Sequence, residues 1–305
     1  MSPEMNGKRA IADGPDFICI GMPKAGTGWL YDQLQSHPDF WMPPVKEVLY
    51  LYRKQPKIPL EGTRGGFGLK HLQEGDERRR KRPHELPRDR SLDLGFIEAA
   101  TLCNSSPRDL NLYAALFRFK GERLSGDVSP VYADLDDEMI AQVAGRFPST
   151  KLVMMVREPI SRVWSRLNML PAEKFDETLL EDSSRFRNFL ETSPIIRDLS
   201  YPTQVVQRWR SKAPNLPQHH FLLDDVAAEP EKTRAEIWSY LGADPGKTTP
   251  LPADYNRKRK GAKPARLQMN ATARSALVEV FRDELMACAA MFGGRAQQWP
   301  AKYGL

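Results

Sequence analysis

The stretch DFICIGMPKAGTGWLYDQLQSHP, residues 16–38, decides the fold of this chain. Its first part, DFICIGM, is a short apolar run with β-branched and aromatic residues, which predicts a buried parallel strand. Trp29, Leu30 and Leu34 follow at helical spacing, and Pro38 ends the helical pattern. A strand, a glycine-rich loop and a helix in this order can bind an anion, because a helix N-terminus presents backbone N–H groups.

The loop within this unit is close to a phosphate-binding loop but differs from it in one respect. Gly21 and Gly26 have the spacing of G-x-x-x-x-G-K-[ST], yet Thr27 occupies the lysine position. The lysine stands three residues earlier, at Lys24. Taken alone, the pattern leaves three interpretations open: a nucleotide site that lost its lysine, a tight turn that matches by chance, or a loop built for a different anion.

Strands and helices alternate along the rest of the chain. Further strands are predicted within 122–132, 151–159 and 219–225. Helices are predicted within 96–118, 134–148, 160–170, 202–214 and 229–243, and 270–293 is predicted to close the chain as a pair of helices. This alternation predicts an α/β fold, a three-layer α/β/α domain around a mainly parallel central sheet.

The 305 residues, 1–305, are predicted to form a single domain, because no internal repeat and no persuasive boundary divides them. Residues 1–15 are expected to be flexible. Residues 53–95, rich in proline, glycine and charge, are expected to form a surface excursion or a lid. In sheets of this class a ligand binds beyond the carboxyl ends of the strands, which is where the loop with Lys24 begins.

Composition sets the broad class of the protein. No apolar run is long enough to span a bilayer and the N-terminus lacks a signal-peptide core, so we expect a cytoplasmic protein without a membrane span. Cys19, Cys103 and Cys288 are far apart, so neither a disulfide framework nor a metal site is expected, and Cys19 is interpreted as a small core residue. Basic runs at 76–90 and 256–266 contribute to the net charge of +6 and favour an anionic partner. No aromatic residues interleave with these runs, so nucleic acid is not expected.

A second strand, loop and helix carries another candidate anion site. In VREPISRVWS, residues 156–165, Arg157 leaves the strand end and Ser165 lies two helical turns further on. An arginine is suited to planar phosphate recognition, and a serine hydroxyl can add a hydrogen bond. Arg157 alone could equally be half of a structural ion pair. Two such loops at neighbouring strand ends predict a ligand with two separated phosphate-like groups.

The strings PKAGTGW, residues 23–29, and REPISRVWS, residues 157–165, resemble two motifs of the sulfotransferase family whose donor is 3′-phosphoadenosine 5′-phosphosulfate (PAPS). These motifs are P-K-x-G-T-x-W and R-[DE]-P-x-x-R-x-x-S, and the chain matches every defining position. The similarity continues through 201–243, where DDV stands for the family's E-D-L, and it covers roughly residues 15–265. It implies a P-loop NTPase-like sulfotransferase fold and a protein close to the carbohydrate and bacterial branch.

The resemblance implies donor-binding roles for residues of both loops and of a late basic segment. They are Lys24, Ala25, Gly26, Thr27, Gly28, Trp29, Arg157, Ser165, Lys260 and Gly261. Lys24 would stabilise the charge that develops on the bridging oxygen. Trp29 would pack against the adenine, with a core tryptophan as the open alternative. Arg157 and Ser165 would bind the 3′-phosphate together with a cation of the segment NRKRKG, residues 256–261. This segment departs from the R-K-G-x-x-G form of cytosolic members; we favour Lys260 with Gly261, and Arg257, Lys258 and Arg259 are the alternatives.

The resemblance also implies a general base for the acceptor. In carbohydrate members a glutamate in a K-E-P-x-F-F-like string follows the loop lysine, and Glu47 in VKEVLYL stands at the corresponding distance from Lys24. We therefore predict Glu47 as the catalytic base. A surface glutamate paired with Lys46, or a histidine such as His71 or His84 as the base, is the alternative.

The string GDVSPVY, residues 126–132, resembles the E-K-[ST]-P-x-Y segment that lies beside the acceptor site in the family. Asp127 and Ser129 are therefore candidate acceptor contacts, although Asp127 could equally support the base or cap the following turn. Val128 stands where the heparan enzymes have a lysine that contacts acidic sugars. This replacement weakens the case for a highly sulfated polysaccharide acceptor.

The residues and the resemblance together predict a PAPS-dependent sulfotransferase (EC class 2.8.2). It would transfer a sulfonyl group in line to a hydroxyl or amine of a small-molecule, lipid or carbohydrate acceptor and release adenosine 3′,5′-bisphosphate (PAP), without a metal ion. Two other function classes compete. A P-loop kinase or nucleotide hydrolase would need an acidic magnesium ligand, and a non-catalytic nucleotide- or RNA-binding protein would lose affinity steeply with salt.

Overall fold

The computed structural model describes residues 13–52, 57–58, 60, 88–255 and 266–305. In this part of the chain, parallel strands form one sheet in the order β2-β1-β3-β4. They are β1 (Phe17–Gly21), β2 (Gly126–Val128), β3 (Lys151–Val156) and β4 (Gln218–Leu222). Each strand overlaps a stretch in which the sequence predicts one.

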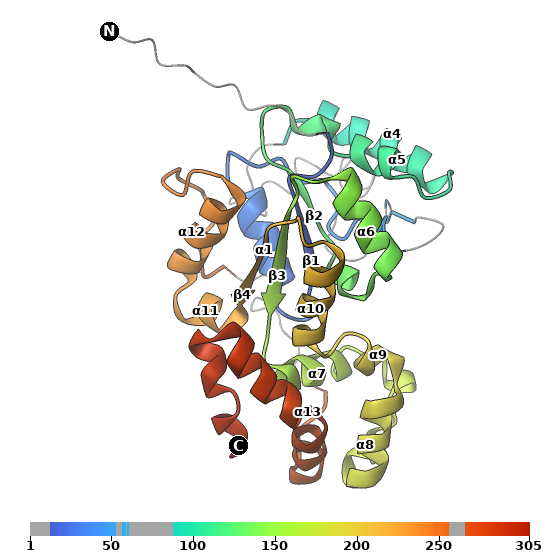
Figure 1. The fold of residues 1–305 in the computed structure, drawn as a ribbon, viewed down its shortest axis with the longest axis vertical. Helices are drawn as coiled ribbons and strands as arrows, with labels where there is room; N and C mark the ends of the chain where they lie inside the picture. Colours follow the sequence, from blue (N-terminus) through green and yellow to red (C-terminus); the bar gives the residue numbers. More distant parts are fainter. Residues whose placement is uncertain (1–12, 53–56, 59, 61–87, 256–265) are drawn as a thin grey trace.

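Helices flank the sheet on both faces, with α11 and α12 to its left and α6 and α10 to its right in Figure 1. The α-helices are α1 (Thr27–Gln35), α4 (Arg90–Asn104), α5 (Leu110–Ala115), α6 (Asp137–Arg146), α7 (Pro159–Leu167), α8 (Ser183–Thr192), α9 (Pro194–Arg197), α10 (Pro202–Lys212), α11 (Leu223–Ala228), α12 (Pro230–Leu241) and α13 (Ala271–Phe292). The short 3₁₀ helices are η1 (Arg118–Lys120), η2 (Pro130–Asp134), η3 (Ala172–Lys174), η4 (Glu177–Glu181), η5 (Gly294–Gln298) and η6 (Ala301–Tyr303). The predicted three-layer α/β/α fold is confirmed.

The strand order places a topological switch point between β1 and β3. The chain leaves β1 for β2 on one side and then crosses to β3 on the other side. Loops that follow the two strands at such a point diverge and leave room for a ligand. The loop after β1 carries Lys24 and the loop after β3 carries Arg157. In Figure 1 the β3 arrow points toward α7 and α13, so these helices mark the end of the sheet that holds the candidate site.

Strand β1 is buried along its whole length, as a strand covered by helices on both faces requires. Cys19 is fully buried, which confirms its interpretation as a core residue. The amino end of the strand is held by Lys120, whose ammonium group donates to Gly14 O and to Asp16 Oδ2 at 2.8 Å each. This buried ion pair anchors β1 at the end opposite to the candidate site.

The segment 270–293 corrects the prediction of a helix pair, because it forms the single helix α13. Its buried residues run from Ala273 to Cys288 at spacings of one, three and four positions, so one largely apolar face packs against the domain. No proline or glycine stands between Ala271 and Phe292 to break the helix.

The last residues of the range 53–95, predicted as a surface excursion or lid, are described and belong to a helix. Helix α4 begins at Arg90, and the carboxylate of Asp93 is buried in an ion pair with Arg88 at 2.6 Å. This pairing removes the Asp93 charge from solvent and lets the start of α4 pack on the domain. Ile58 is buried as well, and its N–H donates to Asn104 Oδ1 at 2.6 Å.

Two expectations fall mostly outside the described residues. They concern a lid within 53–95 and a flexible terminus at 1–15, of which 53–56, 59, 61–87 and 1–12 are not described. Both stay predictions. Gly14 and Pro15, at the end of the second range, are buried, so these two residues belong to the packed domain.

Candidate active site

The loop after β1 enters helix α1 through a glycine that the geometry requires. Gly26 is the N-cap of α1 with φ 95° and ψ 8°, the left-handed conformation that disfavours side chains. A Cβ atom at this position would lie 2.7 Å from Leu223 Cδ1. The loop is tied to β3 by the Met22 N–H, which donates to Met155 O at 2.7 Å. Its course is therefore determined by the fold.

The N-terminus of α1 is open to a ligand. No side chain of the described residues caps it, whereas α4, α5, α6 and α8 each begin with an aspartate cap. The first N–H groups of a helix have no partner within it, and the helix dipole favours an anion there. Gly28 is exposed on this turn, and a Cβ atom there would meet nothing within 4 Å. With Ala25 and Thr27 buried on either side of Gly26, the residues present fit a phosphate group.

The N-terminus of α7 is instead occupied by a carboxylate of the chain. Glu158 Oε1 accepts the Ile160 N–H at 2.6 Å, and Glu158 Oε2 accepts the Ser161 N–H at 2.9 Å as well as the Ser161 hydroxyl. Glu158 is only 1% exposed. A ligand anion cannot use N–H groups that are already bonded. In this loop the side chains of Arg157 and of Ser165, which is half-buried on α7, are left to bind it.

The two loops meet across the switch point. Arg157 Nη1 donates to the Lys24 carbonyl oxygen at 3.2 Å. Burial lowers the pKa of the Arg157 guanidinium, while the nearby charges of Glu158 and Asp224 raise it; an arginine remains a cation at neutral pH. Lys24 Nζ contacts Met169 Sδ at the protein surface. The structure thus brings two of the three cationic residues predicted for donor binding into contact, the Arg157 guanidinium with the Lys24 backbone.

Lys24 and Glu47 share an uncommon backbone conformation. Among the non-glycine residues that the structure describes, φ is positive at Lys24 (72°), Glu47 (64°) and Leu49 (61°). Such residues cluster at functional sites, because only a surrounding structure that over-determines them can hold them. Glu47 Oε1 also pairs with Lys46 Nζ at 2.6 Å, the contact that the alternative interpretation expects. The role of Glu47 as base stays a prediction, supported by its backbone.

The two predicted acceptor contacts, Asp127 and Ser129, are fully buried. The Asp127 carboxylate accepts hydrogen bonds from the hydroxyls of Ser129 at 2.6 Å, Tyr132 at 2.7 Å and Tyr113 at 3.1 Å. Burial raises the pKa of Asp127 to about 6, although these hydrogen bonds act in the opposite direction. We call these four side chains the Asp127 network. Their geometry favours a supporting role over direct contact with an acceptor.

The Asp127 network holds the loop that carries Glu47. The Val48 N–H donates to the Asp127 carboxylate, the Leu49 N–H to the serine hydroxyl at 3.1 Å, and the Leu51 N–H to the Tyr132 hydroxyl at 3.3 Å. Three backbone groups therefore converge on one carboxylate, directly or through a hydroxyl. This arrangement explains how the positive φ of Glu47 is maintained, and it is the supporting role that the sequence left open for Asp127.

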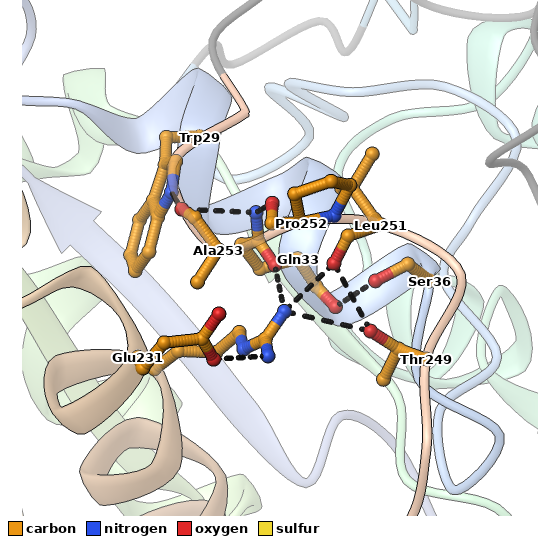
Figure 2. Close-up of polar contacts among 9 residues, drawn as sticks. Trp29, Gln33, Ser36, Glu231, Thr249, Leu251, Pro252 and Ala253 are labelled. Atoms are coloured by element: carbon orange, nitrogen blue, oxygen red, sulfur yellow. Dashed lines mark hydrogen bonds and ion pairs between the residues drawn. The ribbon is translucent and has the colours of Figure 1, made fainter.

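Trp29 is held by its indole N–H. The side chain is 8% exposed, and Nε1 donates to Ala253 O at 2.6 Å. Figure 2 shows Trp29 and Gln33, both from α1, facing the segment 249–253, and Gln33 Nε2 donates to Pro252 O at 3.0 Å. Trp29 therefore belongs to the core on the side of its N–H, and its contact with an adenine stays a prediction.

Arg234 of α12 locks the same segment onto α1, a role that sequence reasoning missed. Its Nη1 donates to Leu251 O at 2.7 Å and to Gln33 Oε1 at 3.2 Å, contacts drawn in Figure 2. The segment leads toward the predicted late clamp. Lys260 and Gly261 of that clamp lie outside the described residues, so their role stays a prediction.

The alternative base, a histidine, has no support among the described residues near the loops. His37 is fully buried, its Nδ1 accepts the Asp39 N–H at 3.1 Å, and its Nε2 lies 3.0 Å from Asp244 O. These contacts make it a structural residue. His71 and His84 lie outside the described residues.

Glu158 is the residue whose role the sequence could have revealed. A polar residue directly before a proline at the first helical position is typical of an N-cap, and Glu158 precedes Pro159 in this way. For Tyr113 and Tyr132 no such local signal exists, because their contact with Asp127 depends on packing.

A family model described as "Sulfotransferase family" matches residues 15–245. The chain belongs to the sulfotransferase family. Carbohydrate sulfotransferase 15 from Homo sapiens and that from Mus musculus are each 25% identical to it over 190 residues, 57% of this chain and 31% of the relative. The chain thus spans about a third of the length of these curated relatives.

Solved structures confirm the sulfotransferase fold. A sulfotransferase from Alicyclobacillus acidocaldarius superposes with a TM-score of 0.59 at 20% identity, over 94% of this chain and 99% of that one. A sulfotransferase domain from the curacin biosynthetic pathway superposes with a TM-score of 0.50 at 14% identity, over 88% and 97% of the two chains. The predicted similarity to carbohydrate and bacterial sulfotransferases is therefore confirmed.

Two further findings concern only the described residues. None of their helices is both long and apolar enough to cross a bilayer. Within the same ranges, no three side chains of histidine, cysteine, aspartate or glutamate gather as a metal site would need. The cytoplasmic location and the metal-free reaction stay predictions.

Proposed function

We propose that this chain is a PAPS-dependent sulfotransferase. The observation that carries the proposal is the pair of anion-binding loops at the switch point, joined by the hydrogen bond from Arg157 Nη1 to Lys24 O at 3.2 Å. One loop offers an open helix N-terminus and the other an arginine. A ligand with a 5′-phosphosulfate and a 3′-phosphate needs both. Membership of the sulfotransferase family supports the same assignment.

PAPS would supply a sulfonyl group joined to a phosphate that can leave, and the residues of the chain would do the rest. The N–H groups at the start of α1 would orient the 5′-phosphate. The Lys24 ammonium group would balance the negative charge on the leaving oxygen. Arg157 and Ser165 would hold the 3′-phosphate, and Glu47 would take the proton of the attacking hydroxyl.

For the acceptor we propose a glycan hydroxyl, with small-molecule and lipid hydroxyls or amines as the alternatives. The curated relatives are named carbohydrate sulfotransferases, and this supports a glycan. Val128, in the place of the lysine of the heparan enzymes, is buried and brings no charge to an acceptor surface. A sparsely charged glycan therefore fits better than a highly sulfated one.

Thermal unfolding with ligands tests the donor. A ligand that binds only the folded chain adds about 2.7 kcal/mol of stability at a hundred times its Kd. We expect PAP to raise the midpoint of unfolding by several degrees without a metal, and ATP with Mg²⁺ to leave it unchanged. Stabilisation by ATP with Mg²⁺ alone would overturn the proposal in favour of a kinase or hydrolase. Salt-sensitive RNA binding without any effect of PAP would favour the non-catalytic alternative.

Glu47→Gln and Lys46→Gln test the base as a matched pair. Both substitutions break the Lys46–Glu47 ion pair, but only the first removes a carboxylate that can accept a proton. We expect Glu47→Gln to lower turnover by about 10²–10⁴ and to keep PAP affinity. Lys46→Gln should stay within about tenfold of the intact chain. Equal losses of turnover in the two variants would show that Glu47 acts only as the ion-pair partner of Lys46.

A further inference from the structure

The C-terminal segment, residues 294–305, lies beyond the residues 15–245 that the family model matches. It folds back from α13 toward the site. Arg295 forms ion pairs with Asp225 of α11 and with Glu229, the residue between α11 and α12, at 3.1 Å each. In Figure 1 the C-terminus lies beside α13 and below α11, at the end of the sheet toward which β3 points. The segment therefore reaches the same end of the sheet as the two anion-binding loops.

Tyr303 is the residue by which this segment touches the second loop. Its hydroxyl donates to Glu158 Oε2 at 2.8 Å. The Arg274 guanidinium lies over the Tyr303 ring, 4.8 Å from its centroid. The side chain is therefore held by its ring and by its hydroxyl. Burial and the adjacent Glu158 charge raise the pKa of the Tyr303 hydroxyl. The Tyr303 hydroxyl therefore keeps its proton at neutral pH and can donate it in this hydrogen bond.

The Glu158 carboxylate stands next to Arg157, the cation that binds the 3′-phosphate in the proposed function. The Glu158 charge acts on the Arg157 guanidinium, so it competes with a phosphate for that group unless hydrogen bonds satisfy it elsewhere. The Ile160 and Ser161 groups that bond to Glu158 belong to α7 itself. Among the described residues, the donor from outside α7 is Tyr303. Ser161 and Tyr303 both donate to Glu158 Oε2, so the tyrosine hydroxyl helps to hold the carboxylate where it caps α7.

We propose that Tyr303 is a positioning residue for donor binding. It keeps the Glu158 carboxylate in the N-terminus of α7 and so leaves Arg157 available to the 3′-phosphate. This inference rests on the proposed function, and it adds to the site a residue from a segment that the family motifs do not include.

Tyr303→Phe tests the inference, because it keeps the ring over which Arg274 lies and removes only the hydroxyl. The affinities of PAP and of adenosine 5′-monophosphate, which lacks the 3′-phosphate, are measured by isothermal titration calorimetry. We expect the Kd of PAP to rise about five- to tenfold and the Kd of the monophosphate to stay unchanged. A purely structural hydroxyl would weaken both ligands or neither.

Tyr240→Phe is the matched control. The Tyr240 hydroxyl likewise donates from a half-buried ring, its one hydrogen shared between Leu152 O at 3.1 Å and Pro217 O at 3.0 Å, but it does so at the amino ends of β3 and β4. Its removal should leave the ratio of the two Kd values unchanged. In a Glu158→Gln background the effect of Tyr303→Phe on this ratio should shrink, because the competing charge is gone.

The outcomes separate the inference from the function on which it rests. An intact chain that binds PAP no better than the monophosphate would overturn the proposed function and the inference with it. An intact chain that prefers PAP, together with a Tyr303→Phe variant that keeps the full preference, would overturn the inference alone.

Discussion

The two loops predicted to bind anions follow similar strands but enter their helices through different N-cap residues. Both follow a buried parallel strand at the switch point, and both enter a helix of nine residues. At α1 the N-cap is Gly26, without a side-chain cap among the described residues, whereas at α7 the N-cap is Glu158, which accepts two backbone N–H groups. The same strand–loop–helix unit can therefore bind an anion through backbone or through side chains, and the N-cap residue decides which.

We expect the largest effects when the cationic side chain of either loop is removed, because each loop is predicted to depend on its own cation. Lys24→Ala should lower turnover by about 10²–10³, because no group then balances the charge on the leaving oxygen. Arg157→Ala should raise the Kd of PAP by about tenfold or more, because side chains alone bind the anion in that loop. Turnover with saturating donor and the Kd of PAP are measured for each variant.

The two effects should not be interchangeable. If Lys24→Ala lost only affinity and Arg157→Ala lost only turnover, the assignment of the loops would be reversed. Lys46→Gln, which removes a cation from a neighbouring loop, controls for a general loss of positive charge.

A glycine pair tests whether the open end of α1 faces the ligand. Gly26→Ala should destabilise the chain by about 1–3 kcal/mol, because φ is 95° and the Cβ atom would lie 2.7 Å from Leu223 Cδ1. Gly28→Ala should leave stability equal or higher by up to about 1 kcal/mol, yet raise the Kd of PAP about tenfold by analogy with other close backbone contacts to phosphate. Urea unfolding and calorimetry measure the two quantities. A Gly28→Ala variant with unchanged PAP affinity would place the ligand elsewhere.

For Asp127 we expect a smaller effect, on the pH dependence of the free energy of unfolding. Like Glu158, Asp127 is a buried carboxylate that accepts hydrogen bonds from backbone and hydroxyl groups. Burial raises the pKa of Asp127 to about 6 from an ordinary value of 3.8. Between these two pH values the folded chain holds a proton that the unfolded chain has released. The contribution of Asp127 to the free energy of unfolding is therefore fully present below the lower value and is lost as the pH rises through about 6.

The measurement compares the free energy of unfolding of the intact chain and of Asp127→Asn at about pH 5 and about pH 7.5. The intact chain should gain stability relative to the variant at the lower pH. Tyr113 and Tyr132 do not contribute in this window, because burial raises the pKa of both hydroxyls well above 10. A difference that is the same at both pH values would show that Asp127 does not titrate there.

The sheet, the first loop and helices α1 and α7 could be predicted from the residues, because buried parallel strands are continuous apolar runs and glycine, proline and periodicity mark the turns. The closing helix was predicted wrongly as a pair, since length alone does not break a helix that lacks proline and glycine. Within the candidate site, the motifs predicted that the loops of Lys24 and Arg157 lie together, and Arg157 Nη1 does donate to Lys24 O.

The motifs could not predict whether a residue contacts the substrate or holds another part of the site in place. Asp127 and Ser129 lie in a motif beside the predicted acceptor, yet their side chains face the interior and hold the Glu47 loop. The Tyr303 hydroxyl bonds to Glu158, 145 residues away in the sequence, and no local sequence pattern predicts this contact. Local sequence determines which elements form, because propensity and periodicity act over a few residues. The direction of a polar side chain depends instead on distant elements that pack around it, and these come together only in the folded chain.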